Sequence, residues 1–160
     1  MRDNRPILLA TDGSPSAAKA QSEAFELAKA LDAPLLVVSV EHVVVPAVGY
    51  AGFGYSDVVG ELSEAEEKRV NALLAEIEES ASEAGLRCRT THSEGAVADE
   101  IGRIAAERDA RMIVVGSHGW GAGKRLLFGS VSTALLHLAP CPVLVVRGAD
   151  EASVVRPEAA

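Results

Sequence analysis

Residues 116–130 form a glycine-rich segment between an apolar run and a helical pattern. The segment reads Gly-Ser-His-Gly-Trp-Gly-Ala-Gly-Lys-Arg-Leu-Leu-Phe-Gly-Ser. Backbone N–H groups in such a loop, and in the first turn of the helix that follows, lack intrahelical partners and carry partial positive charge. A phosphate group suits them, with the Ser130 and Ser132 hydroxyls as further donors and Lys124 and Arg125 as added charge. The segment therefore predicts a phosphate site.

The residues alone leave open whether these glycines bind phosphate or merely turn the chain, with Lys124 and Arg125 as solvated surface. Two better-known motifs do not match. A Walker A loop requires Gly-x4-Gly-Lys-Ser/Thr, but His118 and Arg125 occupy its first and last defined positions. The glycines at 119, 121 and 123 are one residue short of the dinucleotide fingerprint Gly-x-Gly-x-x-Gly. Neither motif can be assigned.

A second polar group, Asp12-Gly13-Ser14, follows the first apolar run of the chain. Asp–Gly is common turn chemistry, so Asp12 could have a purely structural role. Its position at the end of a predicted strand favours a binding role, because ligands of open α/β sheets bind beyond the carboxyl ends of the strands.

Apolar runs alternate with helical patterns along the whole chain. Strands are expected at residues 6–11, 34–41, 86–92, 111–117 and 143–147. Helices are expected after a Ser14 N-cap, from a capping box at Ser63, from Ala96 and from Ser130. Residues 42–60, with a glycine-rich core at 49–55, are expected to be irregular. This order predicts an α/β fold, a doubly wound parallel sheet of five strands with helices on both faces.

The composition is that of one globular domain. Of 160 residues, 48% are hydrophobic and 24% charged, and the net charge of -8 argues against duplex DNA or an anionic membrane as the main partner. No apolar stretch approaches the roughly 18 residues of a membrane span. Cys88 and Cys141 form no Cys-x-x-Cys pair, which favours a reducing, cytoplasmic compartment. Residues 1–148 are expected to form the domain and 149–160 a flexible tail.

The spacing of the loop glycines resembles a known family. Gly116-x2-Gly119-x9-Gly129-Ser130 matches the Gly-x2-Gly-x9-Gly-Ser/Thr pattern of the ATP-binding universal stress proteins. Ile-Leu-Leu-Ala-Thr-Asp-Gly-Ser14 is similar to the family's first strand and acidic turn, and Ala-Pro-Cys-Pro-Val-Leu-Val-Val-Arg147 to its closing strand. Ala96 departs from the family, since many members carry Pro there.

The resemblance implies a sheet in the order 3-2-1-4-5, with ATP at the switch point between strands one and four. Asp12 would then lie near the ribose or a Mg²⁺ ion, and Val40 would present its backbone to adenine. The loop would supply the remaining contacts to ribose and phosphates, from Gly116, Gly119, Gly129, Ser130, Val131 and Ser132.

Two functions are compatible with this assignment. The first is a nucleotide-binding regulatory module of the stress response, acting on a protein partner of unknown identity. The second is a slow ATPase or adenine-nucleotide hydrolase, which would need a group that positions or deprotonates water. His118 and Asp12 are the base candidates near the loop, so whether the chain is an enzyme stays open.

The resemblance also implies a homodimer. In the order 3-2-1-4-5, strands three and five form the edges, and strand three carries charges that blunt it against pairing. Residues Val143–Val146 carry no charge, so a bare fifth strand would invite aggregation. We therefore expect strand five to be covered by a second copy.

Overall fold

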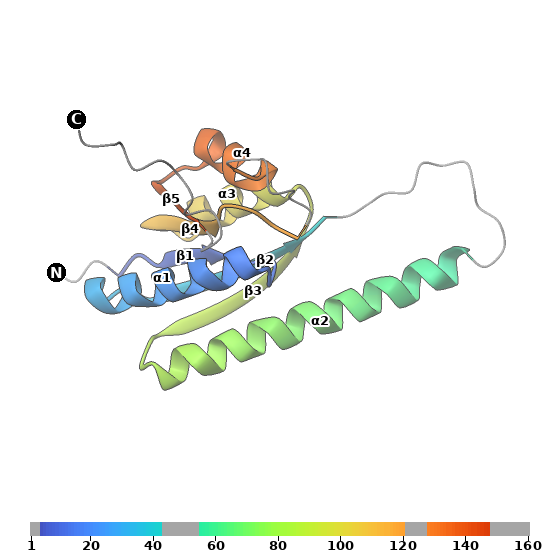
Figure 1. The fold of residues 1–160 in the computed structure, drawn as a ribbon, viewed down its shortest axis with the longest axis horizontal. Helices are drawn as coiled ribbons and strands as arrows, with labels where there is room; N and C mark the ends of the chain where they lie inside the picture. Colours follow the sequence, from blue (N-terminus) through green and yellow to red (C-terminus); the bar gives the residue numbers. More distant parts are fainter. Residues whose placement is uncertain (1–3, 43–54, 121–127, 148–160) are drawn as a thin grey trace, which may run out of the picture.

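The computed structural model describes residues 4–42, 55–120 and 128–147, with residues 55–63 described by their backbone alone. Strands and helices alternate along the chain (Figure 1). The strands are β1 (Ile7–Ala10), β2 (Leu35–Glu41), β3 (Cys88–Glu94), β4 (Met112–Gly116) and β5 (Val143–Val146). The helices are α1 (Pro15–Leu31), α2 (Tyr55–Glu83), α3 (Val97–Glu107) and α4 (Ser130–Leu138).

The five strands form one parallel sheet in the order β3-β2-β1-β4-β5, which confirms the expected topology. Ala10, the last residue of β1, lies beside Val38 of β2 and Val115 of β4. The chain after β1 and the chain after β4 therefore leave the sheet side by side at its carboxyl edge. Connections that diverge from adjacent strands leave a crevice at that edge.

Each face of the sheet carries its own apolar core, because strand side chains alternate between the two faces. On one face, Ile7, Leu9 and Val37 pack against α1 and α2. On the other, Leu8 and Val38 pack with residues of α3 and α4. Figure 1 shows α1 and α2 on the opposite side of the sheet from α3 and α4. Both faces are buried, as a doubly wound sheet requires.

The start of α1 agrees with its sequence signal. The Ser14 hydroxyl accepts a hydrogen bond from the Ala17 N–H at 3.2 Å, and Pro15 follows it as the first helical residue. Proline costs nothing at this position, since its missing N–H would have no intrahelical partner. This cap fixes the place where the chain turns from β1 into α1, next to Asp12.

The start of α2 and both ends of β3, which extends to Glu94 rather than 92, differ from the prediction. Helix α2 begins at Tyr55 rather than at Ser63, because apolar residues at 55, 58, 59 and 62 continue the helical spacing and outweigh the single Gly60. Strand β3 begins at Cys88, not at 86, because the Leu86 N–H still closes α2 by donating to the Ala81 carbonyl. The predicted irregular stretch at 42–60 is therefore helical from residue 55.

Two predictions concern segments that the structure does not describe. Most of the glycine-rich stretch at 49–55 and the tail at 149–160 lie outside the described residues. Over the parts that the structure does describe, no helix combines the length and the apolar character needed to cross a membrane.

Candidate functional site

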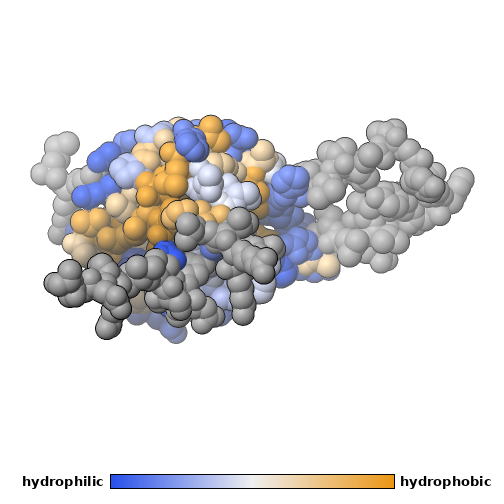
Figure 2. Space-filling model, turned by 45° about the horizontal axis from the view of Figure 1, so that its top comes forward, coloured by the Kyte–Doolittle hydropathy of each residue, from blue (hydrophilic) through white to orange (hydrophobic). Residues whose placement is uncertain are grey.

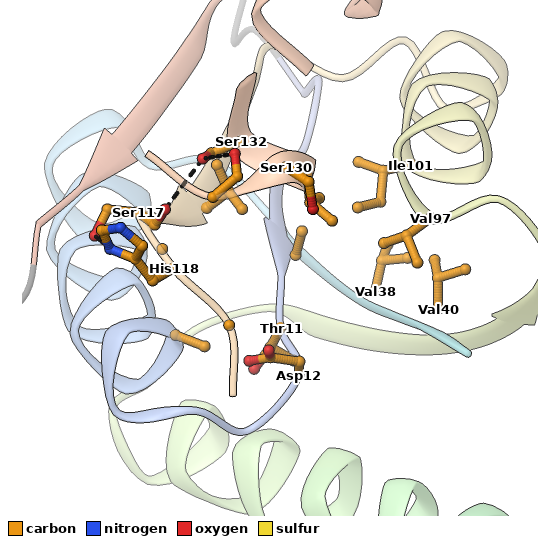
Figure 3. A pocket seen from close by; sticks show the side chains of 17 residues that line it. Thr11, Asp12, Val38, Val40, Val97, Ile101, Ser117, His118, Ser130 and Ser132 are labelled. Atoms are coloured by element: carbon orange, nitrogen blue, oxygen red, sulfur yellow. Dashed lines mark hydrogen bonds between the residues drawn. The ribbon is translucent and has the colours of Figure 1, made fainter. Parts of the chain in front are cut away.

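A cavity of about 440 Å³ opens at the carboxyl edge of the sheet, where β1 and β4 end. Its walls come from the ends of β1, β2 and β4, the first residues of α1, and the starts of α3 and α4. Its size is within the range of pockets that hold small molecules and cofactors. Figure 3 shows the side chains that converge on it.

All eight residues that the sequence singled out lie on this cavity, although they come from four separate parts of the chain. They are Asp12, Val40, Gly116, Gly119, Gly129, Ser130, Val131 and Ser132. The structure thus brings the acidic turn, the end of β2 and the glycine loop to one place. Their individual roles toward a ligand stay predictions.

One end of the cavity is apolar. Val38 and Val40 point into it from β2, and Val97 and Ile101 face them from α3 (Figure 3). Of these four, sequence analysis identified Val40 alone. The spacing of Val97 and Ile101, one helical turn apart, is the same for a core position and for a ligand wall, so only the fold could separate the two.

The opposite end is polar and is formed by the start of α4. The Thr133 N–H donates to the Gly129 carbonyl, so the N–H groups of residues 130–132 belong to the first turn, where intrahelical partners are lacking. Ser132 is buried, and its hydroxyl donates within the loop, to the carbonyl oxygens of Ser117 (3.1 Å) and Gly129 (3.0 Å). These two contacts of the Ser132 hydroxyl hold the loop against the start of α4.

Asp12 has a structural task beside any role toward a ligand. One carboxylate oxygen, Oδ1, accepts a hydrogen bond from the Ser14 N–H at 2.9 Å, which closes the turn into α1. Gly13 adopts a φ of +75° in this turn, a conformation that favours glycine. The other oxygen, Oδ2, faces Gly119 across the cavity mouth. The structural role expected for Asp12 therefore belongs to Oδ1, and Oδ2 is the oxygen available for the expected binding role.

Arg69 of α2 sets the charge behind this turn. Its side chain hydrogen-bonds Glu66 (Nε to Oε2, 2.9 Å), which is the main reason that its pKa is raised. The carboxylates of Asp12 and Glu41 contribute to the same rise through their negative charge. Arg69 therefore lies close enough to Asp12 for their opposite charges to interact.

At each of the three glycines of the motif, a different neighbour limits the space for a side chain. A Cβ on Gly116 would lie 2.8 Å from the Ser16 carbonyl carbon and 2.9 Å from the Ala17 nitrogen, both in the backbone of α1. A Cβ on Gly119 would lie 2.6 Å from Asp12 Oδ2. A Cβ on Gly129 would lie 3.1 Å from the Ser117 carbonyl oxygen, and φ there is an ordinary -74°.

These distances separate the glycines by what surrounds them. A side chain at Gly116 would collide with the start of α1. The φ of Gly129 is one that any residue adopts, so the nearby Ser117 carbonyl, not the backbone conformation, favours glycine there. Gly116 thus serves helix–strand packing as well as lining the cavity.

His118 is held on the α1 side of the loop. Its Nδ1 lies 3.1 Å from the Ser117 hydroxyl, which in turn lies 3.2 Å from the Ser16 hydroxyl. Figure 3 shows the His118 ring beside Ser117, apart from Ser130 and from the apolar wall. Among the residues that the structure describes, no three or more His, Cys, Asp or Glu side chains gather as a metal site would require.

Comparison with known proteins agrees with this architecture. The model of the family described as "Universal stress protein family" matches residues 3–147. The chain is 35% identical over 144 residues to universal stress protein YxiE of Bacillus subtilis, covering 88% of this chain and 97% of the relative.

Solved structures show the same fold. Universal stress protein UspA from Lactobacillus plantarum superimposes with a TM-score of 0.78 at 25% identity, over 89% of this chain and 97% of the other. A universal stress protein solved in complex with cAMP superimposes with a TM-score of 0.65 at 24% identity, over 91% of this chain and 98% of the other. At that identity the second likeness concerns the fold alone.

Proposed function

The chain belongs to the universal stress protein family, and from that membership and the chemistry of its cavity we propose that it is a regulatory module of the stress response that binds an adenine nucleotide, with ATP as the preferred ligand. One observation carries the proposal: a single cavity has an apolar end fit for a base and a polar end fit for phosphates. A nucleotide has the same division of character along its length.

The apolar end suits adenine. Val38, Val40 and Val97 offer aliphatic walls to a flat ring, and the backbone of Val40 at the end of β2 would supply the polar contacts to its edge. Backbone groups can distinguish one base from another without a charged side chain, so specificity for adenine over guanine would come from this strand end.

Backbone dipoles at the polar end suit phosphates. Among the described residues that line the cavity, none is Lys or Arg, and Lys124 and Arg125 of the loop lie outside the described residues. The N–H groups at the start of α4 and the Ser130 hydroxyl would hold the phosphate oxygens, as helix N-termini commonly do. Ser132 would support them, since its hydroxyl already fixes the loop.

A Mg²⁺ ion fits this arrangement without a dedicated cage. Magnesium is usually held by one or two carboxylates together with phosphate oxygens and water. Asp12 would provide the carboxylate through Oδ2, the oxygen that faces Gly119 and is not used to close the turn.

Calorimetry of the nucleotide-free protein tests the proposal, with ATP, ADP, AMP, cAMP and GTP as separate ligands. We expect one site per chain, and at least about tenfold tighter binding of ATP than of GTP, a difference of about 1.4 kcal/mol. Absence of binding by every adenine nucleotide would refute the proposal.

A variant pair locates the base. Val97→Asp places a carboxylate in the apolar end, at the first residue of α3, where an acidic side chain favours the helix. It should weaken ATP binding by at least about tenfold. Val97→Ile keeps the wall apolar and serves as the matched control, with affinity close to that of the wild type.

Binding without rapid turnover fits the site best. Groups that hold phosphates equally in the ground state and in the transition state do not accelerate hydrolysis. Both base candidates have structural partners: Asp12 Oδ1 accepts from Ser14, and His118 Nδ1 contacts Ser117. We expect turnover below about one per minute, far under the median enzyme value of roughly 10 per second.

Phosphate release under single-turnover conditions distinguishes this from the alternative, a slow ATPase or nucleotide hydrolase. Release should be slow in the wild type and unchanged in His118→Ala. Fast release that His118→Ala abolishes would make the protein an ATPase.

We also propose that two copies pair through β5. This edge strand carries four apolar residues and no charge, and Leu136, Leu138 and Leu144 are exposed on α4 and β5. Figure 2 shows apolar side chains gathered on the side of the molecule where Figure 1 places these two elements. A second copy offers a matching strand edge, which satisfies the open backbone groups of the first. The regulatory partner and the cytoplasmic location stay predictions.

A further inference from the structure

Two chain connections meet at the mouth of the cavity: the turn from β1 into α1 and the loop that leaves β4. Two inner contacts join them. The Ser14 hydroxyl donates to the His118 carbonyl at 3.3 Å, and the Ser16 and Ser117 hydroxyls lie 3.2 Å apart. Ser14 and Ser117 are almost fully buried, so this inner part of the junction is built into the core.

An outer contact joins the same two connections at the surface. The indole Nε1–H of Trp120 donates to the Asp12 carbonyl oxygen at 2.9 Å. The Trp120 side chain is exposed, and it is not among the residues that line the cavity. Because most of the indole ring is in water, burial of apolar surface contributes little to holding it against Asp12.

The Trp120 bond acts on a residue that the site needs. Two hydrogen bonds hold Asp12: Oδ1 accepts from the Ser14 N–H, and the backbone carbonyl oxygen accepts from Trp120. The second bond ties Asp12 to the residue next to Gly119, the glycine that Asp12 Oδ2 faces. Together with the two inner contacts, the Trp120 bond therefore helps to set the distance between Gly119 and the Asp12 carboxylate.

We propose that Trp120 is a positioning residue of the nucleotide site, which holds Asp12 and Gly119 in register so that carboxylate and loop meet the ligand together. This inference rests on the proposed function. It assigns to Trp120 no contact with the nucleotide, only the orientation of two groups that make such contacts.

The chain contains one tryptophan, so the inference has its own spectroscopic signature. Indole emission depends on the surroundings and on the hydrogen bond of the ring. A ligand that contacts Asp12 and Gly119 should change the surroundings of the indole ring and so its emission, whereas the emission of a ring with no link to the site would stay the same.

The experiment uses the full chain and three variants: Trp120→Phe, Gly119→Ala and the double variant. Trp120→Phe keeps an aromatic ring and removes the N–H donor. We expect about a fivefold weaker affinity for ATP by calorimetry, with an unfolding temperature lowered by no more than about 2–4 °C, the cost of one neutral hydrogen bond in a chain of this size. Ser22→Ala, which removes an exposed hydroxyl bond within α1, is the control and should bind as the wild type.

Two further results are expected. The emission of Trp120 in the wild type should change on titration with ATP, with the same half-saturation as in calorimetry. Trp120→Phe should cost less in the Gly119→Ala background than in the wild type, because both changes act through Asp12.

Wild-type affinity in a folded Trp120→Phe variant would overturn the inference, as would an emission that ignores a ligand known from calorimetry to bind. Either result leaves the proposed function intact. Failure of the wild type itself to bind any adenine nucleotide overturns both the inference and the proposed function.

Discussion

Gly116 and Gly119 are three residues apart in one motif, yet different neighbouring atoms exclude a side chain at each position. The position of a Cβ on Gly116 is occupied by the backbone of α1, which cannot move without shifting the helix. The position of a Cβ on Gly119 is occupied by Asp12 Oδ2, the end of a side chain that can shift without moving the backbone of a helix. The same substitution should therefore have opposite consequences at the two positions.

We predict that Gly116→Ala loses stability and Gly119→Ala loses function. Gly116→Ala should lower the free energy of unfolding by about 1–3 kcal/mol, the usual cost of overpacking. Gly119→Ala should unfold like the wild type and bind ATP about tenfold more weakly, because the displaced Asp12 carboxylate leaves its place in the site. Thermal unfolding and calorimetry on the two variants separate the effects, and a stable Gly116→Ala with normal binding would contradict the packing argument.

At this scale the sequence predicted half of the cavity well. The resemblance of the glycine spacing to the family motif located the polar end, because glycine content alone also fits a loop that merely turns the chain. At the apolar end only Val40 was predicted, because Val97 and Ile101 have the pattern of core residues. Trp120 escaped prediction, since its bond to the Asp12 carbonyl joins residues 108 positions apart.

The connection between β3 and α3 positions Val97 and Ile101. A network of side-chain hydrogen bonds around Glu100 stabilises this connection. Glu100 of α3 accepts hydrogen bonds from Arg103 at 2.7 Å and from the Ser93 hydroxyl of β3 at 2.7 Å. The first of these bonds is the main cause, and the second a further cause, of a Glu100 pKa lowered to about 2. Gly95, with φ of +142°, makes the turn between them.

This network predicts a pH dependence. The Glu100 pKa is about 2 in the folded protein against 4.5 for an unperturbed carboxyl. Its stabilising effect is therefore complete above the unfolded value and is lost as the pH falls from about 4.5 to about 2. The difference in unfolding temperature between the wild type and Glu100→Gln should be constant near neutrality and shrink across that window.

Glu76→Gln, a change of an exposed carboxylate on α2, controls for the general loss of negative charge. A wild type that keeps its full advantage over Glu100→Gln at about pH 2 would mean that the bonds from Ser93 and Arg103 contribute nothing through the charge of Glu100.

Element types were predictable, whereas the start of α2 and the bounds of β3 were not. The alternation of apolar runs and helical patterns predicted, in the right order, the strands and helices found over the described residues. The start of α2 was misplaced because the Ser63 capping signature also fits a helix interior, where nothing local forbids continuation. The start of β3 depended on the closing bond of α2 from Leu86, a detail of the tertiary structure.

The two edges of the sheet differ in how they meet solvent. Strand β3 presents charged residues, among them Arg89 and Glu94, whereas β5 presents only Val and Leu. Val145 and Val146 pack in part against the two cores, and Leu144 is the exposed member of the strand. Leu144 is therefore the residue whose change tests association without disturbing a core.

We predict that Leu144→Lys converts a dimer into a monomer, because it places a charge in an apolar strand edge that two copies would share. Arg89→Glu, which reverses a charge at the opposite edge, should leave the dimer unchanged. Light scattering with size-exclusion chromatography measures both. A Leu144→Lys protein that remains dimeric would rule out pairing through β5.

An adenine nucleotide in the cavity between β1 and β4 would change the surroundings of the backbone amides that line it. Amide chemical-shift mapping by NMR, with isotope-labelled wild-type protein titrated with ATP, reports binding and its location together. We predict the largest shifts at Gly119, Gly129, Ser130 and Val131 and at the end of β2 around Val40, with little change at Gly85 after α2. Saturating ATP that moves no amide, or that moves amides only away from the cavity, would contradict this prediction.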